Sequence, residues 1–191
     1  MGRLILILGG ARSGKSTQGQ RLARAHGGKV VFIATAEAQD DEMRDRIAAH
    51  KSERTPDWQT LEIPYNVAEV FARLSPPADV VLFDCLTLLV SNLLLLGGDI
   101  DQPDVAEAEN RLEVEIRALL EAIRSGRADW IVVSNEVGLG LVPPYPSGRV
   151  YRDLLGRANQ RLAARADEVY WMVAGIPVPI HGYRENLNIE M

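Results

Sequence analysis

The sequence predicts an α/β fold in which a mostly parallel sheet carries helices on both faces. Short, continuous apolar runs of the buried-strand type recur along the chain, and segments with apolar residues at helical spacing separate them. Strands that alternate with helices are joined by crossovers, which make the strands parallel and cover both sides of the sheet. In such sheets, ligands bind at the carboxyl ends of the strands.

The strands are assigned first, from the apolar runs RLILIL, KVVFIA, DVVLFD, WIVVS and EVYWMVA. These runs predict strands at 3–8, 29–34, 79–84, 130–134 and 168–174, and a shorter strand is expected at 58–63. A loop rich in glycine and proline is expected at 135–148.

The helices between the strands follow from apolar residues that recur at helical spacing. Helices are expected at 16–25, 40–52, 66–74 and 86–96. Pro103 is expected to open a longer helix, and the last helix is expected at 150–166. The inward-facing residues of these two last helices are predicted to be Leu112, Ile116, Leu119 and Ile123, and Tyr151, Leu154, Leu155, Ala158 and Leu162.

The composition is that of one globular domain spanning residues 1–191. The net charge of -5 argues against a nucleic-acid partner, because such binding depends on clustered lysine and arginine. Cys85 is the only cysteine, so no internal disulfide can form and a cytoplasmic location is expected. The apolar start at 4–8 is too short for the core of a secretory signal.

A second apolar segment, 80–96, resembles a membrane span in its hydropathy but is interrupted by polar residues. We interpret it as a buried strand followed by a buried helix, and we expect no membrane span. The interrupting residues are Asp84, Thr87, Ser91 and Asn92.

The sequence GGARSGKS at 9–16 fits the phosphate-binding loop (P-loop) pattern G-x-x-x-x-G-K-[ST]. It lies between a predicted strand and a predicted helix, which is the context that the pattern requires. The loop amides and the helix N-terminus would bind phosphates. Lys15 would contact the β- and γ-phosphates, and Ser16 would ligate Mg²⁺. The predicted fold is therefore of the P-loop NTPase type. The alternative is an ordinary glycine turn.

A second acidic ligand for Mg²⁺ is expected at the end of a strand next to the P-loop strand. Asp84, which ends the run at 80–84, is the candidate. The alternative is that Asp84 caps the helix that follows. Glu136 also follows a buried strand, and it is either a substrate or metal contact or a simple loop acid.

His50 lies between Arg46 and Arg54 at i, i+4 spacing, which would group basic side chains on one helical face suited to a phosphate. The alternative for His50 is a surface or hydrogen-bonded structural residue. His26 and His181 are interpreted as structural, and the scattered histidines and single cysteine make no zinc site.

Further motifs extend along the chain: IATA at Ile33, DDEM at Asp40, RIAAHK at Arg46, SNEVG at Ser134 and GRANQRLA at Gly156. Together with the P-loop, they resemble the bifunctional adenosylcobinamide kinase / adenosylcobinamide-phosphate guanylyltransferase family of cobalamin biosynthesis. The resemblance covers nearly the whole chain and ends near Ile180.

The resemblance implies a corrinoid substrate, a homotrimer and guanylylation of His50, with GTP as nucleotide and ATP possible for the kinase step. It departs at Pro144, where an acid would be expected after Pro143. The motif and the resemblance together assign nucleotide contacts to Gly9, Gly10, Ala11, Arg12, Ser13, Gly14, Lys15, Ser16, Ala34, Thr35, Ala36, Lys51, Ser52, Glu53, Arg54, Glu62 and Asp84.

Three functions are compatible with these residues. The first is a bifunctional transferase in which His50 and Lys15 are catalytic and Ser16 and Asp84 hold Mg²⁺. The second is a small-molecule kinase without a covalent intermediate, in which His50 only contacts phosphate. The third is a nucleotide switch without catalysis. The apolar helix at 86–96 also suggests a surface for assembly, with a simple core helix as the alternative.

Overall fold

The computed structural model describes residues 2–36, 57–74, 77–96, 98–99 and 101–180. The predicted helix at 40–52, His50, the segment 51–54 and His181 lie outside these ranges. In chain order the elements are β1 (Leu4–Gly9), α1 (Lys15–His26), β2 (Val30–Ala34), β3 (Gln59–Glu62), α3 (Val67–Leu74), β4 (Val80–Asp84), α4 (Leu86–Leu95), α5 (Val105–Ser125), β5 (Asp129–Val133), α6 (Pro146–Ala163), β6 (Glu168–Val173) and β7 (Ile176–Pro179).

The strands form one seven-stranded sheet in the order β3-β2-β4-β5-β1-β6-β7. Every neighbouring pair is parallel except β6 and β7, which are antiparallel. The four central strands, β2, β4, β5 and β1, are buried, apolar runs, because side chains on both faces of the sheet meet packed helices. The predicted fold class is confirmed.

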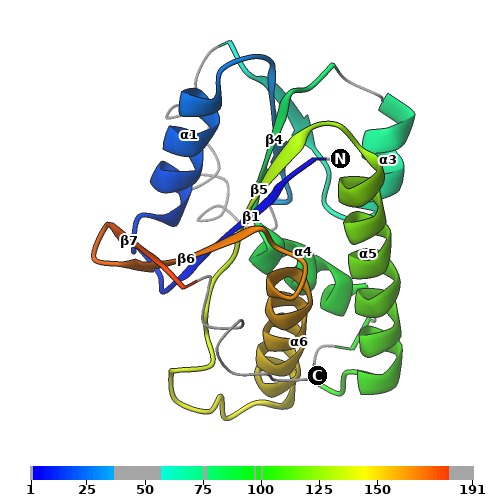
Figure 1. Ribbon diagram of the computed structural model, residues 1–191. Helices are drawn as coiled ribbons and strands as arrows, with labels where there is room; N and C mark the ends of the chain where they lie inside the picture. Colours follow the sequence, from blue (N-terminus) through cyan, green and yellow to red (C-terminus); the bar gives the residue numbers. More distant parts are fainter. Residues whose placement is uncertain (1, 37–56, 75–76, 97, 100, 181–191) are drawn as a thin grey trace.

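The two faces of the sheet carry different helices (Figure 1). Helix α1 packs on one face, where Ala23 joins a core with Ile7, Phe32 and Leu82. Helices α3, α4, α5 and α6 cover the other face and form the larger core. The predicted inward residues of α5 and α6 are buried there, with Tyr151 packed against the core. The carboxyl ends of the parallel strands therefore all lie at the same edge of the sheet.

Some boundaries differ from the prediction. Helix α5 begins at Val105, since the Asp104 carboxylate accepts a hydrogen bond from the Glu107 amide and makes Asp104 the N-cap. Helix α6 begins at Pro146, inside the predicted loop, because proline fits the first turn of a helix. Strand β7 was not predicted. It contains Pro177 and Pro179, and it lies at the sheet edge, where proline is tolerated.

Helix α4 is covered by the chain's own core. Leu86, Leu89, Val90 and Leu93 are buried between the sheet, α5 and α6, while Leu96 just beyond the helix is exposed. The expectation that this helix offers surplus apolar surface for assembly is therefore wrong. Within the described residues, the structure contains no helix with the length and apolarity needed to cross a membrane.

Candidate nucleotide-binding site

The predicted strand, P-loop and helix follow one another as β1, residues 9–16 and α1. Gly9 ends β1, and a Cβ atom there would lie 2.8 Å from the carbonyl oxygen of Met172. Gly14 is the N-cap of α1 and has φ 92°, a left-handed conformation that favours glycine. The loop therefore needs glycine at both of these positions.

The P-loop is held from two sides by segments that are distant in sequence. The Gly175 amide, in the turn between β6 and β7, donates a hydrogen bond of 3.0 Å to the Ser13 carbonyl oxygen. The Glu136 amide, just after β5, donates one of 3.1 Å to the Gly9 carbonyl oxygen. These contacts fix the loop conformation before a ligand binds, which lowers the entropic cost of binding.

Lys15 is only 8% exposed, and its Nζ donates a hydrogen bond of 2.6 Å to the Gly10 carbonyl oxygen. Burial lowers the pKa of Lys15, while negative charge on Cys85 or Asp84 acts in the opposite direction. Burial also raises the pKa of the Cys85 thiol to about 12, so this thiol stays protonated at neutral pH and Asp84 is the acidic group that acts on Lys15. A protonated thiol is a weak nucleophile, so this environment does not favour reactivity at Cys85.

Asp84 is the last residue of β4, in register with Ala34 of β2, which in turn pairs with Glu62 of β3. The prediction that Asp84 lies on the strand next to the P-loop strand is wrong, because β5 separates β4 from β1. Lys15 still reaches the neighbourhood of Asp84 because α1 crosses over β5 and β4. The N-cap of α4 is Cys85, so the alternative role of Asp84 as the cap is wrong.

Thr35 follows β2, and its side chain is fully buried. Its hydroxyl donates a hydrogen bond of 2.6 Å to the Cys85 carbonyl oxygen and accepts one of 3.1 Å from the Cys85 amide. The Asn92 side-chain amide donates to the carbonyl oxygens of Thr35 at 2.8 Å and Pro64 at 3.0 Å. This network joins the ends of β2 and β3 to α4, and it turns the Thr35 side chain toward α4.

A second polar network supports the segment after β5. The Ser134 hydroxyl donates to Asn159 Oδ1 at 2.6 Å, and Asn159 Nδ2 donates to the Asn135 carbonyl oxygen at 2.9 Å. The Asn135 amide donates to Thr87 Oγ1 at 2.9 Å. Sequence reasoning singled out no role for Asn159; a polar residue on the buried face of a predicted helix was the available signal.

Glu136 has a local role that the sequence left open. Its Oε1 accepts a hydrogen bond of 2.5 Å from the Gly138 amide, so the carboxylate shapes the turn that leaves the sheet. His26 lies elsewhere: its Nε2 is 3.3 Å from Asp129 Oδ2, in keeping with the structural interpretation of this histidine.

The P-loop retains a polar group that suits a phosphate. Ser13 Oγ is buried and has no hydrogen-bond partner within the part of the chain that the structure describes. Ser16 and Asp84 are both half-buried and offer a hydroxyl and a carboxylate oxygen, the donors that Mg²⁺ prefers. Among the described residues there is no group of three or more His, Cys, Asp and Glu suited to a metal. Mg²⁺ beside phosphates needs only one or two protein ligands, so this donor set fits it.

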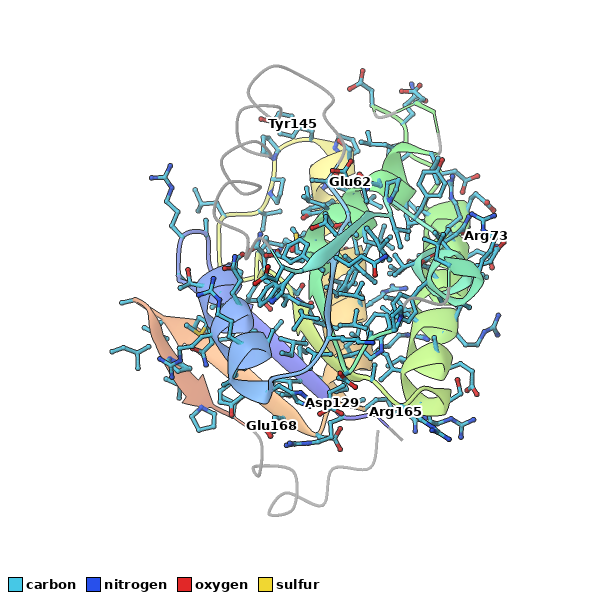
Figure 2. The ribbon with its side chains drawn as sticks, turned by 90° about the horizontal axis from the view of Figure 1, so that it is seen from above. Glu62, Arg73, Asp129, Tyr145, Arg165 and Glu168 are labelled. Carbon is cyan, nitrogen blue, oxygen red and sulfur yellow. The ribbon has the colours of Figure 1, made fainter. Side chains whose placement is uncertain are left out.

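Of the sequence-predicted contacts, the structure describes residues 9–16, 34–36, Glu62 and Asp84. All of them lie at or beside the carboxyl edge of the sheet, as Figure 2 shows for Glu62. Ala34 and Thr35 are buried, Ala36 is half-buried and Glu62 is exposed. Lys51, Ser52, Glu53, Arg54 and His50 lie outside the described residues.

A parallel sheet whose first strand leads into a GxxxxGKS loop, with the loop lysine beside a strand-end aspartate, defines a nucleotide-binding protein of the P-loop NTPase type. The family model for cobinamide kinase / cobinamide phosphate guanyltransferase matches residues 5–180. The chain therefore belongs to the cobinamide kinase / cobinamide phosphate guanylyltransferase family.

Named relatives agree with this family. The chain is 43% identical to the bifunctional adenosylcobalamin biosynthesis protein CobU of Salmonella typhimurium, over 93% of this chain and 99% of the relative. It is 41% identical to CobU of Escherichia coli with the same coverage. It is 44% identical to the bifunctional adenosylcobalamin biosynthesis protein CobP of Pseudomonas aeruginosa, over 93% of this chain and 96% of the relative.

Proposed function

We propose that this protein phosphorylates adenosylcobinamide on its aminopropanol hydroxyl and then transfers GMP from GTP to the new phosphate through a guanylylated His50. The family match over residues 5–180 carries the proposal. The P-loop geometry supports it, because both reactions begin with a bound nucleoside triphosphate.

In the kinase step, the acceptor hydroxyl oxygen attacks the γ-phosphorus and the nucleoside diphosphate leaves. Lys15 moves its hydrogen bond from the Gly10 carbonyl oxygen to the β- and γ-phosphate oxygens. The loop amides and the unpartnered Ser13 hydroxyl donate to the same phosphates. The loop amides and the Ser13 hydroxyl are already in place, so they stabilise the charge of the transition state with little reorganisation.

Ser16 and Asp84 would hold Mg²⁺, which when bound neutralises charge on the triphosphate. The placement of Lys15 near Asp84 supports this assignment, since the cation and the metal would then flank the same phosphates. The further contacts of Glu62 and of residues 34–36 to the nucleotide belong to the proposal as well.

In the nucleotidyl step, a neutral imidazole of His50 attacks the α-phosphorus of GTP, and pyrophosphate leaves from the P-loop. Arg46 and Arg54, at i, i+4 spacing from His50, would stabilise the charge that develops. A phosphate oxygen of the cobinamide phosphate then attacks the phosphoramidate, which frees His50 and completes the transfer. Lys51, Ser52 and Glu53 complete the proposed contacts of this segment.

Three finer points belong to the proposal. GTP is the guanylyl donor, and either GTP or ATP feeds the kinase step. The protein acts in the cytoplasm, which its single cysteine favours. It assembles as a homotrimer, by resemblance to the family; the buried side chains of α4 lend this no support.

Turnover with adenosylcobinamide tests the proposal. The protein is incubated with the acceptor, Mg²⁺ and either GTP or ATP, and the corrinoid products and pyrophosphate are separated and quantified. We expect the phosphate first and then the GDP conjugate, with one pyrophosphate released for each conjugate. Product that stops at the phosphate would indicate a kinase alone, and nucleotide binding without any acceptor turnover would indicate a switch.

A further inference from the structure

The loop between β5 and α6 exposes several large apolar side chains. Leu139 is 82% exposed, Leu141 97%, Val142 68% and Tyr145 65%. A single exposed leucine needs no explanation, but several in seven successive residues indicate a surface that binds something. We refer to residues 138–145 as the apolar loop.

The apolar loop is held in one conformation by two arginines of α6. Arg152 donates through Nη2 to the Gly138 carbonyl oxygen at 2.6 Å and through Nη1 to that of Gly140 at 3.4 Å. Arg149 Nη1 donates to the carbonyl oxygens of Pro143 at 3.2 Å and Pro144 at 2.7 Å. The backbone carbonyls are thus engaged by α6 while the apolar side chains stay exposed, which prepares the loop for binding without further ordering.

The apolar loop lies beside the site of phosphoryl transfer. It begins two residues after Glu136, whose amide donates to the Gly9 carbonyl oxygen at the start of the P-loop. In Figure 2, Tyr145 lies toward the same edge as Glu62, at the carboxyl end of β3, while Asp129 and Glu168 lie toward the opposite edge. A group bound to this loop would therefore approach the triphosphate from the β5 and α6 side.

We infer that the apolar loop binds the ring of the corrinoid acceptor and so presents its aminopropanol arm to the triphosphate. This inference rests on the proposed function. A corrin ring is broad and carries methyl groups and amide-bearing arms around its rim, so an extended apolar surface suits it better than a narrow pocket. The arm that carries the reacting hydroxyl can reach the P-loop only if the ring is held close by, and this loop is an exposed apolar surface that is joined to the P-loop through Glu136.

The test compares substitutions in the apolar loop with a matched leucine elsewhere. Leu141→Ser and the double variant Leu139→Ser, Leu141→Ser remove apolar surface without touching the core. Leu74→Ser is the control, because Leu74 is an exposed leucine at the end of α3, where the chain returns to the opposite edge of the sheet. Equilibrium dialysis with cobinamide gives Kd from the visible absorbance, and radiolabelled GTP gives the covalent label independently of any acceptor.

We expect the double variant to raise Kd for cobinamide at least about tenfold, equivalent to about 1.4 kcal/mol. The single variant should be intermediate, and Leu74→Ser should match the wild type. Covalent labelling by GTP should be unchanged in all of them, because it needs no corrinoid. An unchanged Kd in the double variant would overturn the inference.

Light scattering on the same variants addresses a second copy of the chain as the occupant. If the double variant dissociates into monomers while its Kd for cobinamide is unchanged, the loop is a subunit contact and the inference is wrong. A wild-type protein that turns over no corrinoid would instead contradict the proposed function. The two failures are therefore distinguished.

Discussion

The Gly175 amide donates a hydrogen bond to the Ser13 carbonyl oxygen, so the turn between β6 and β7 lies directly against the P-loop. A Cβ atom on Gly14 would lie 3.2 Å from Gly175 Cα, which shows how closely the two backbones approach. The hairpin at the sheet edge thus helps to set the shape of the phosphate site.

Gly14→Ala should weaken nucleotide binding. The substitution places a side chain at φ 92° and against Gly175, and such strain costs about 1–3 kcal/mol unless the loop moves. We expect Kd for GTP, measured by calorimetry, to rise by about tenfold or more, since each 1.4 kcal/mol is a factor of about ten.

Gly156→Ala is the matched control. Gly156 lies within α6, and apart from its chain neighbours and the backbone of α6 itself, no heavy atom of the described residues lies within 4 Å of a Cβ added there. Nucleotide affinity should be unchanged, and the free energy of unfolding should rise by about 0.5–1 kcal/mol because alanine favours the helix. Equal GTP affinity in the Gly14 and Gly156 variants would show that the contact with Gly175 does not shape the site.

Lys15→Ala should abolish both the kinase and the guanylyltransferase reaction. Both use the triphosphate held by the P-loop, and removal of one transition-state donor costs about 10²–10³ in rate. Initial rates of the two reactions, measured separately, check this. Lys29→Ala, which changes an exposed lysine just before β2, should leave both rates near those of the wild type. Near-native turnover by Lys15→Ala in either assay would show that the P-loop does not serve that reaction.

The sequence predicts those parts of the fold that depend on local pattern. The buried strands and the P-loop were found because continuous apolar runs and the GxxxxGKS spacing are local signals. The position of β5 between β1 and β4 was not predicted, since strand order depends on contacts between distant segments. Strand β7 was missed because Pro177 and Pro179 oppose a strand everywhere except at an edge, and the edge is known only once the sheet is assembled.

The residues that support the site show the same difference between local patterns, which can be predicted, and contacts with distant segments, which cannot. In the sequence, Asn92 was recognised only as a polar interruption of an apolar segment. The carbonyl oxygens that accept its hydrogen bonds belong to Thr35 and Pro64, which are distant in sequence. Asn159 is comparable, because its partners Ser134 and Asn135 belong to another element. A pattern can mark such residues as polar and buried, but it cannot name their partners.

Asn92→Ala should destabilise the protein. The substitution removes the donor to the carbonyl oxygens of Thr35 and Pro64, and an unsatisfied buried polar group costs about 1–3 kcal/mol. Urea unfolding should show this loss in the free energy of unfolding. A change smaller than about 0.5 kcal/mol, the range of ordinary surface substitutions, would contradict the supporting role of Asn92.

Glu115 makes the stability depend on pH. It is buried on α5 and accepts hydrogen bonds from the Asn66 and Val67 amides at the start of α3. Burial raises the pKa of Glu115 above its ordinary value of 4.5, while those amide bonds act in the opposite direction. Between the two values the folded state holds the proton and the unfolded state has lost it, so rising pH favours unfolding.

The comparison variant is Glu115→Gln, which cannot titrate. The quantity compared is the free energy of unfolding of the wild type minus that of Glu115→Gln. We expect this difference to fall as the pH rises from 4.5 through the raised pKa, and to be constant below and above that pH range. Denaturant unfolding over a pH series measures it. If the amide bonds outweighed burial, the folded pKa would lie below 4.5, and the difference would instead rise with pH below 4.5 and stay level above it.

Intact mass after incubation with GTP tests the central claim, the covalent guanylyl transfer, most directly. The wild type should gain the mass of one GMP, and the adduct should disappear in mild acid and survive alkali, as a phosphoramidate does. His50→Ala should gain no mass while retaining much of the kinase activity, because γ-phosphoryl transfer needs no protein nucleophile. An adduct that persists in His50→Ala, or one that maps to Lys51, would contradict the account.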